Sequence, residues 1–565
     1  MKDVIKKYLY ESLRLWVVIG SFVFTYNEAW GFEIDGISYS VSGRTAIITG
    51  CDHSIKEIVL PDSVDYNGKK YPVTEIEFQA FSQRSNLERI KLPKSVISIG
   101  DKCFYYCTNL KSVTLSDSLT TIGRSAFSHC SVLDSLTLPN SITRIGDEVF
   151  SGCKGLRAVI LPESITWIGK YTFNQCTNLS YIRLPKGLRT IYEYAFADCS
   201  SLRYLEIPNG VESIGKGCLL GCINLEELVV PYVGTEKNPQ GPSRESLFGN
   251  LFGSTKRDSC TLTLQCYGTG SSSYEMFYIP NKLSKVVVTG NTNLYYAFYG
   301  CGNIKEIVLR DVSYIGAKSF YNCSGLTNLA LPESLTTIES YAFMGCSSFK
   351  KMEIPNGVES IGEGCLLGCI NLEELVVPYV GTEKNPQGPS KNTLLGTLFG
   401  TSRSDGCIET EQRFKSGSNS EALVIFYIPE KLSKVTVTGN SNLYYTFSNC
   451  GNIKEINIRN VSIIGERTFY GCSGLTNLNL PETLTAIGDR IFDGCSSLTS
   501  VTFPESLNCF GDNCFQGWSG LTSLTLPDSL TTIKSYAFSG CSGLTSLTLP
   551  ESLTTIESFA FEGCI

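Results

Sequence analysis

Histidine is almost absent from this chain, and the shortage limits what the protein can do. Only His53 and His129 occur among 565 residues, so a Ser-His-Asp triad or a histidine-based metal site has few candidates. The sequence also lacks a phosphate-binding loop and a dinucleotide fingerprint. No carboxylate pair stands out from the polar repeat faces, as glycoside hydrolysis would require. We therefore expect no enzymatic activity, no catalytic residue and no cofactor.

An excess of positive charge is missing as well. Lysine and arginine total 47, aspartate and glutamate total 54, and the formal net charge is −7. Proteins that bind nucleic acid gain much of their affinity by neutralising phosphates with basic side chains. We therefore expect no nucleic-acid partner.

The apolar run near the N-terminus is short. Leu15–Thr25 contains eleven residues, which is too few to cross a bilayer and matches the core of a signal peptide. A basic start precedes this run, and small residues at Ala29 and Gly31 suit cleavage before Phe32. The pattern predicts a signal peptide over 1–31, a secreted or cell-surface location, and no transmembrane span in the mature chain. A buried helix with a basic start is the alternative.

One stretch of 23 residues is abundant instead. Its clearest copy is Leu521–Gly543, LTSLTLPDSLTTIKSYAFSGCSG, and Leu544–Ile565 repeats it directly. Earlier copies begin at intervals of 23 residues, at Leu87, Leu110, Leu133, Leu156, Leu179 and Leu202. A fixed period of this size predicts a solenoid, in which each coil buries its hydrophobic edges against its neighbours.

Each part of the repeat has a structural interpretation. Leu521, Leu524 and Leu526 follow the pattern L-x-x-L-x-L, whose end alternates like a strand with one buried face. Pro527 ends this strand because it has no N–H for a hydrogen-bonded ladder. The Phe538 position is aromatic in nearly every coil. We therefore expect an aromatic stack along the core.

Cysteine recurs three residues after this phenylalanine. Fifteen of the 24 cysteines occupy this position, where parallel side-chain directions are unsuitable for disulfides between neighbouring coils. The spacing of Cys103 and Cys107 could suggest a metal site, but the first cysteine stands where other coils have alanine, and no histidine is near. We expect buried, unreactive thiols and no metal site.

The repeat resembles the BspA-like leucine-rich repeat. That family's pattern is close to L-x-x-[IL]-x-[LI]-P-x-x-[LV]-x-x-I-G-x-x-A-F-x-x-C, and the chain reads LDSLTLPNSITRIGDEVFSGC at Leu133–Cys153. The resemblance covers nearly everything after Phe32, in about nineteen coils of one phase. It implies a solenoid of leucine-rich repeats with a parallel β-sheet along one face. Short strands and turns, or 3-10 or helical corners, are expected on the other face.

The regular coils are expected over 55–224, 283–371 and 432–565. Turn signals between alternating residues at 32–54 predict an N-terminal β cap, which would cover the open end of the solenoid. No polar capping segment follows the final coil, so we expect no C-terminal cap.

Two coils break the phase, at 225–282 and 372–431. Their openings are nearly identical, which indicates an internal duplication of about six coils with a long insertion in each half. Insertions in repeats map to loops that are often functional. The polar segments Thr255–Met276 and Thr401–Ala422 differ between the two halves, and we expect them to be mobile.

The resemblance implies adhesion, since members of the family are associated with attachment to host matrix proteins and to other cells. A long solenoid face can hold many weak contacts, and multivalency then supplies avidity. We therefore expect a protein partner from the host matrix or a cell surface. A carbohydrate-binding accessory protein and a structural spacer without its own ligand are the alternatives.

The candidate contact residues lie in the middle coils. The third and fifth positions of L-x-x-L-x-L point away from the core, and in the last coils they are serine and threonine. In the middle coils, larger side chains replace these small residues at the same or adjacent positions: Arg157, Tyr181, Arg183, Arg203, Tyr204 and Glu206. Tyrosine and arginine often dominate protein interfaces. These six residues are the predicted binding site, and an ordinary solvated strand face is the alternative.

Overall fold

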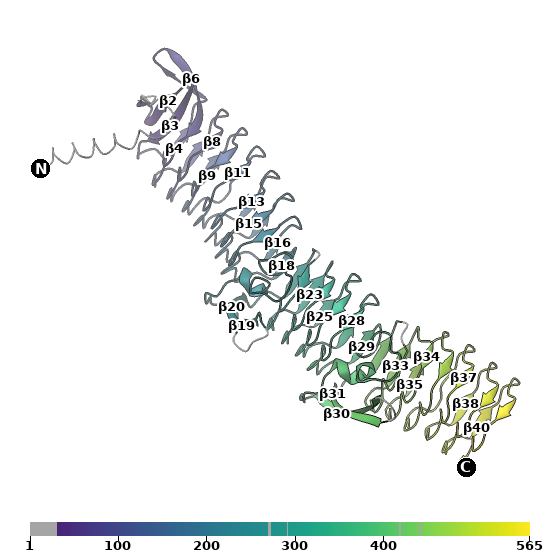
Figure 1. Cartoon of the computed structure of the whole chain (residues 1–565). Helices are drawn as coiled ribbons and strands as arrows, with labels where there is room; N and C mark the ends of the chain where they lie inside the picture. The colour runs from purple at the N-terminus through teal and green to yellow at the C-terminus, as the bar shows by residue number, and fades with distance from the viewer. Residues whose placement is uncertain (1–30, 269–272, 291, 417–419, 440–441, 565) are drawn as a thin grey trace, which may run out of the picture.

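The computed structural model describes residues 31–268, 273–290, 292–416, 420–439 and 442–564. The predicted signal peptide lies outside these residues apart from Gly31. Figure 1 shows a long rod of stacked coils. The chain is a solenoid of leucine-rich repeats with a period of about 23 residues, so the predicted fold class is confirmed.

A small antiparallel unit begins the rod. Strands β1 (Gly31–Ile34), β2 (Ile37–Ser42) and β3 (Thr45–Cys51) pair in sequence order, and β3 continues in parallel to β6 (Lys69–Ile76). Strand β5 (Ser63–Tyr66) forms a hairpin with β6. Strand β6 then pairs with the first regular coil, so the chain 31–76 is continuous with the solenoid sheet.

Two lines of parallel strands run along the rod. The first line contains the alternating part of L-x-x-L-x-L, which buries its central residue and exposes the flanking ones. Its strands are β4 (Glu57–Val59), β7 (Arg89–Lys91), β9 (Ser112–Thr114), β12 (Ala158–Ile160), β14 (Tyr181–Arg183), β16 (Tyr204–Glu206), β18 (Glu227–Val230), β21 (Lys285–Val288), β23 (Glu306–Leu309), β25 (Asn328–Ala330), β27 (Lys351–Glu353), β29 (Glu374–Val377), β32 (Lys434–Val437), β33 (Glu455–Ile458), β35 (Asn477–Asn479), β38 (Ser523–Thr525) and β40 (Ser546–Thr548).

The second line consists of two-residue strands that end on the buried isoleucine of the repeat or its equivalent. They are β8 (Ser98–Ile99), β10 (Thr121–Ile122), β11 (Arg144–Ile145), β13 (Trp167–Ile168), β15 (Thr190–Ile191), β17 (Ser213–Ile214), β22 (Asn293–Leu294), β24 (Tyr314–Ile315), β26 (Thr337–Ile338), β28 (Ser360–Ile361), β34 (Ile463–Ile464), β36 (Ala486–Ile487), β37 (Cys509–Phe510), β39 (Thr532–Ile533) and β41 (Thr555–Ile556). Turns form the remaining corner of each regular coil.

The first line is not one continuous sheet. Its hydrogen-bonded groups are β4–β7–β9, β12–β14, β16 to β25, β27 to β35, and β38–β40. The coil at Leu133–Leu138 keeps the L-x-x-L-x-L sequence, yet only a single bridge, between Ser112 and Ser135, joins it to the preceding strand. The exposed face therefore has interruptions that an unbroken sheet would lack.

The core holds the predicted aromatic stack. The rings of Phe104 and Phe127 lie 5.1 Å apart and nearly parallel, and those of Phe538 and Phe561 lie 5.2 Å apart. In the first interrupted coil the 3-10 helix η1 (Phe248–Leu251) supplies Phe248, whose ring lies 5.1 Å from Phe298. The stack is thus confirmed, and the insertion restores it after Leu219. Truncating one ring is expected to cost about 3–5 kcal/mol.

The recurrent cysteines are buried beside this stack, as predicted. The thiol of Cys153 donates a hydrogen bond of 3.1 Å to the carbonyl oxygen of Phe127, one coil earlier, and Cys541 makes the same bond to Phe515. Burial raises the pKa of the Cys153 thiol to about 12. Each such thiol therefore satisfies a buried carbonyl and stays protonated at neutral pH.

Each insertion forms a hairpin on the side of the rod. The first contains β19 (Cys260–Cys266) and β20 (Tyr274–Pro280); the second contains the 3-10 helices η2 (Lys391–Thr393) and η3 (Leu395–Leu398), followed by β30 (Cys407–Ser416) and β31 (Ser420–Pro429). Both hairpins project from the same side of the rod in Figure 1. The sequence suggested mobile segments here, whereas the structure has antiparallel hairpins anchored to the solenoid.

Candidate binding surfaces

The six predicted contact residues lie on three successive coils of the first line. We call them the central strand patch: Arg157, Tyr181, Arg183, Arg203, Tyr204 and Glu206. All six are exposed. Within β14 and β16, alternation turns the patch side chains away from the buried Ile182 and Leu205, and the two other arginines lie immediately before β12 and β16. Tyr181 and Tyr204 expose 51% and 46% of their surface.

Stacking of the coils would place Tyr181 beside Tyr204 and Arg183 beside Glu206, and the contacts of the patch differ in part from this prediction. The Tyr204 hydroxyl donates to Glu206 at 3.0 Å. Partial burial, together with this bond, raises the pKa of Tyr204 to about 12. Arg183 lies 4.0 Å from Glu163 of the preceding coil, and Arg203 pairs with Glu226 of the next at 3.2 Å. These pairs are exposed and contribute little to stability.

Tyr181 and Tyr204 do not stack on each other. Among the described residues, no ring contact joins them, and their strands β14 and β16 belong to separate hydrogen-bonded groups. Arg183 therefore has Glu163 as its ionic neighbour rather than Glu206. Both rings face the solvent from their own strands.

A shallow groove of about 440 Å³ adjoins the patch. It lies where the coil at Leu133–Leu138 lacks a strand, and its walls include Leu136, Ile160, Tyr181 and Arg183. Apolar walls with a few charged groups at the rim are typical of sites that accept a partner's side chain. Tyr181 and Arg183 of the patch therefore border a concave surface as well as a flat one.

Sequence reasoning missed a second exposed surface, on the first hairpin. Leu262, Leu264, Tyr274 and Met276 are each about half exposed, with values of 49%, 51%, 50% and 56%. Leu264 lies opposite Met276 across the strands, so the four side chains share one face. The alternation of threonine and leucine at 261–264 was the available signal. Because the segment was interpreted as a polar loop, this exposed apolar face was not predicted.

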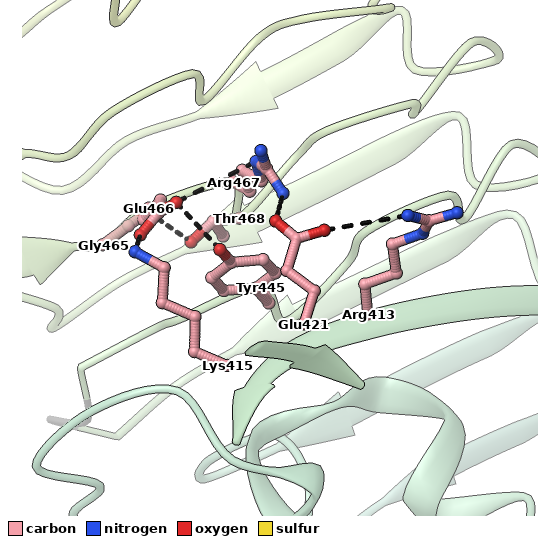
Figure 2. A network of polar contacts seen from close by, with 8 residues as sticks. All are labelled: Arg413, Lys415, Glu421, Tyr445, Gly465, Glu466, Arg467 and Thr468. Carbon is pink, nitrogen blue, oxygen red and sulfur yellow. Dashed lines mark hydrogen bonds and ion pairs between the residues drawn. The ribbon is translucent and has the colours of Figure 1, made fainter. Parts of the chain in front are cut away.

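The second hairpin presents a mixed surface at the same place, where Leu423 and Ile425 stay exposed beside charged side chains. Figure 2 shows Glu421 between Arg413 and Arg467, and Glu466 between Lys415 and Tyr445. The Tyr445 hydroxyl donates to Glu466 at 2.8 Å, and Arg413 lies 3.7 Å from Glu421. Ion pairs thus connect this hairpin to the following coils.

The comparisons with known proteins agree with this architecture. The model of the BspA type leucine rich repeat region matches residues 74–165, 131–237, 292–385 and 443–565, more than half of the chain. The chain belongs to the BspA-type leucine-rich repeat family. No curated protein matches this BspA-type chain in sequence.

Solved structures of leucine-rich repeat proteins from bacteria are similar to this BspA-type chain. One, from Bacteroides ovatus, is 23% identical with a TM-score of 0.29, and the match covers 93% of this chain and 96% of that one. A leucine rich cell surface protein from Faecalibacterium prausnitzii is 18% identical, with coverage of 92% and 95% and a TM-score of 0.34. The T. pallidum leucine rich repeat protein is 34% identical over 35% of this chain and 91% of its own, with a TM-score of 0.32.

Within the described residues, no group of three histidine, cysteine or acidic side chains is placed to hold a metal ion, and no helix is long and apolar enough to span a membrane. His129 stacks on Tyr106 with ring centroids 4.3 Å apart, and burial lowers its pKa. This histidine therefore packs as a neutral ring at the surface of a coil corner.

Proposed function

We propose that this BspA-type chain is a secreted or cell-surface adhesion protein without enzymatic activity. It holds a protein partner from a host matrix or a cell surface along the first line of strands. The proposed contact site is the central strand patch. The observation that carries the proposal is the exposure of Tyr181, Arg183 and Tyr204 at positions where the last coils present only serine and threonine. Tyr181 and Arg183 also line a groove.

The chemistry of the patch suits a protein partner. Half-exposed tyrosines offer a large apolar area together with a hydroxyl, and arginine offers directed hydrogen bonds to carbonyls and carboxylates. The repeated strand face beyond the patch adds weaker contacts, which act together on a partner that follows the rod. Export by the segment 1–31 completes the proposal, since a matrix partner is met outside the cell.

The test uses the full mature chain and purified extracellular-matrix proteins immobilised as a panel. The variant Tyr181→Ser, Arg183→Thr, Tyr204→Ser gives these coils the residues of the last coils. Its melting temperature should stay nearly unchanged, because the replaced side chains face solvent. Its affinity for whichever matrix protein binds should fall at least about tenfold, or ~1.4 kcal/mol.

A matched control changes the same strand positions elsewhere. Lys351→Ser with Glu353→Thr alters the exposed residues of β27 and should leave affinity within about twofold of the unchanged chain. If the folded triple variant bound the matrix protein as tightly as this control, the central strand patch would be rejected as the contact site. Saturable binding to glycans with none to matrix proteins would favour the carbohydrate-binding alternative, and no binding at all would favour a spacer.

Export has its own test. The native protein purified from its source should begin near Phe32 when its N-terminus is sequenced. Recovery of chains with an intact Met1 from the cytosol would contradict the proposed location.

A further inference from the structure

A second groove, of about 480 Å³, lies on the other line of strands, away from the central strand patch. It opens over β13 and β15 and is lined by seven residues of three coils: Asp147, Thr166, Trp167, Lys170, Arg189, Thr190 and Tyr192. Two of these residues are aromatic, and the others carry hydrogen-bonding groups. A concave surface with an aromatic floor and a polar rim is a typical small-ligand site.

The two aromatic residues depart from the repeat at neighbouring positions. Trp167 stands at a strand position where the adjacent coils have Arg144 and Thr190. Tyr192 follows the buried isoleucine, a position that is glycine in the coils on both sides, Gly169 and Gly215. The two rings meet almost at right angles, with centroids 6.1 Å apart. Neighbouring coils have thus both exchanged the usual residue for an aromatic ring, and the rings are in contact.

Glycine allows the chain to pack closely against the Trp167 ring and Asp147. A Cβ atom on Gly169 would lie 2.4 Å from the Asp147 Oδ1 and 3.0 Å from the Trp167 ring, so no side chain fits there. Tyr192 is 43% exposed and Trp167 is partly exposed. Rings held half in water gain less from burial than the fully buried Phe173 and Phe196 of the same coils. Core stability therefore does not account for this aromatic pair.

The rim offers hydroxyl and carboxylate groups. Thr120 and Thr143, the equivalents of Thr166 in earlier coils, donate to a carbonyl one coil back at 3.0 and 3.3 Å. Among the described residues, the Thr166 hydroxyl makes no such bond. The Asp147 Oδ1 accepts the backbone N–H of Lys170 at 2.9 Å, and its carboxylate borders the groove. Donors and acceptors thus surround the rings.

The cations at the rim are already paired. Lys170 lies 3.0 Å from Glu193, and Arg189 lies 3.4 Å from Glu212. Together with Asp147, these carboxylates offset the positive charge, so the groove does not favour an anionic ligand. The perpendicular rings do not form the parallel clamp that holds a flat nucleobase.

We infer that the Trp167–Tyr192 groove binds one neutral hexopyranose unit of a glycan. Such a sugar has an apolar C–H face that packs on an aromatic ring, and its hydroxyls need both donors and acceptors at the edge. Trp167 supplies the stacking surface, Tyr192 the side wall, and Asp147 with Thr166 the polar partners. This site is separate from the central strand patch and goes beyond the proposed protein adhesion.

The experiment titrates the full mature chain with the methyl glycosides of glucose, galactose and mannose, and with neutral oligosaccharides. Binding is followed by saturation-transfer NMR and by tryptophan fluorescence. Trp518, the other tryptophan among the described residues, is fully buried, so a fluorescence change reports on Trp167. A single sugar of about a dozen heavy atoms should bind with a roughly millimolar Kd.

Two variants restore the residues of neighbouring coils and should therefore fold. Trp167→Thr and Tyr192→Gly should each weaken binding of the best sugar at least about tenfold. Tyr314→Thr, at the Trp167 position of another coil, is the matched control and should bind normally. The triple variant of the central strand patch should also bind the sugar normally. The sugar-binding inference is therefore tested independently of the proposed protein adhesion.

Three outcomes would overturn the inference. One is the absence of saturable binding to every neutral glycoside. Another is unchanged sugar binding in both groove variants while they remain folded. The third is a clear preference for methyl glucuronide over methyl glucoside, which would contradict the neutral character of the site.

Discussion

Equivalent glutamines anchor the hairpins of the two insertions to the rod. The side chains that attach each hairpin to the following coils differ between the two. In the first, the buried Gln265 accepts the Gly249 N–H at 2.7 Å and donates to the Tyr299 carbonyl at 3.0 Å. In the second, Gln412 makes the equivalent bonds to Gly396 at 2.8 Å and Ser448 at 3.0 Å. A buried phenylalanine also packs on each of these glycines, where a Cβ would lie 2.2 Å from the ring.

Beyond this shared anchor the chemistry diverges. Leu262 and Leu264 of the first hairpin correspond to Glu409 and Glu411 of the second. Glu466, which holds Lys415 and Tyr445 in the second half, corresponds to Ala317 in the first. Both hairpins pack through equivalent apolar clusters, which contain Leu247, Phe277 and Tyr296 in the first and Leu394, Phe426 and Tyr445 in the second. A duplicated fold thus keeps its internal hydrogen bonds and apolar packing, while the second copy adds an ionic network where the first has apolar side chains.

The largest expected effect tests the shared anchor. Gln265→Leu and Gln412→Leu each leave a buried N–H and a buried carbonyl unpaired, at about 1–3 kcal/mol per group. Both hairpins should therefore lose amide hydrogen-exchange protection to a similar extent, while the coils far from each hairpin keep theirs. A loss confined to one hairpin would show that the other is held by its surface contacts alone. Gln516→Leu, on an ordinary coil corner, is the control.

A smaller effect should separate the two copies. Glu466→Ala gives the second half the residue of the first and removes the partner of Lys415 and Tyr445. We expect a loss of about 1–2 kcal/mol in the opening free energy of the second hairpin, because the pairs are partly exposed. The measurement is hydrogen exchange in β30 and β31 at low and high salt.

Comparing low and high salt shows how much of the attachment of each hairpin is ionic. High salt should narrow the difference between Glu466→Ala and the unchanged chain, since the lost contacts are ionic. The first hairpin should respond little to salt in either protein. A first hairpin that weakens with salt as much as the second would contradict the apolar attachment inferred here.

The smallest effect concerns pH near the second hairpin. Burial, together with the nearby Asp512 and Glu466, raises the pKa of Asp489. A carboxyl with a raised folded-state pKa binds its proton more tightly when folded, so this group adds stability as pH falls through that pKa. Asp489→Asn should remove this contribution and stabilise the protein at neutral pH by less than about 0.5 kcal/mol.

The equivalent residue of the first half is Ser340, which does not titrate in this range. In thermal unfolding, the gain of the Asp489→Asn variant over the unchanged chain should therefore be larger at pH 7 than at pH 4. The mirror variant, Ser340→Asp, shows whether a carboxyl at this repeat position is enough. An equal difference between the Asp489→Asn variant and the unchanged chain at both pH values would contradict this role of Asp489.

The period made the interior of this protein predictable. Because each coil repeats the phase of the last, the burial of Phe127 or Cys153 follows from the pattern of every other coil. The same argument placed Tyr181 and Tyr204 on the exposed face. It could not show that β14 and β16 are separated, because the break depends on small shifts between coils whose sequences keep the full repeat pattern.

The insertions were harder to interpret for a physical reason. Their order depends on Gln265 and Gln412, polar residues that become anchors only when the solenoid supplies buried partners. In the local sequence, such polar residues indicate a solvent-exposed segment rather than a buried anchor. The Trp167–Tyr192 groove escaped attention similarly, since each residue is unremarkable until two neighbouring coils bring the rings together.

The interruptions of the first strand line have a consequence for how the rod comes apart. A solenoid behaves as a one-dimensional array, in which each unit is held by its own stability and by the coupling to its two neighbours. Where strands β25 and β27, or β35 and β38, lack a shared ladder, that coupling loses the hydrogen bonds of the first line. It keeps the core packing and the hydrogen bonds made elsewhere in the coils, such as the β26–β28 pairing and the bond from the Phe515 N–H to the Ala537 carbonyl. Such junctions are weak links in the array. Under heat or pulling force, unfolding fronts should stop at them, so the molecule yields in blocks of several coils rather than one coil at a time.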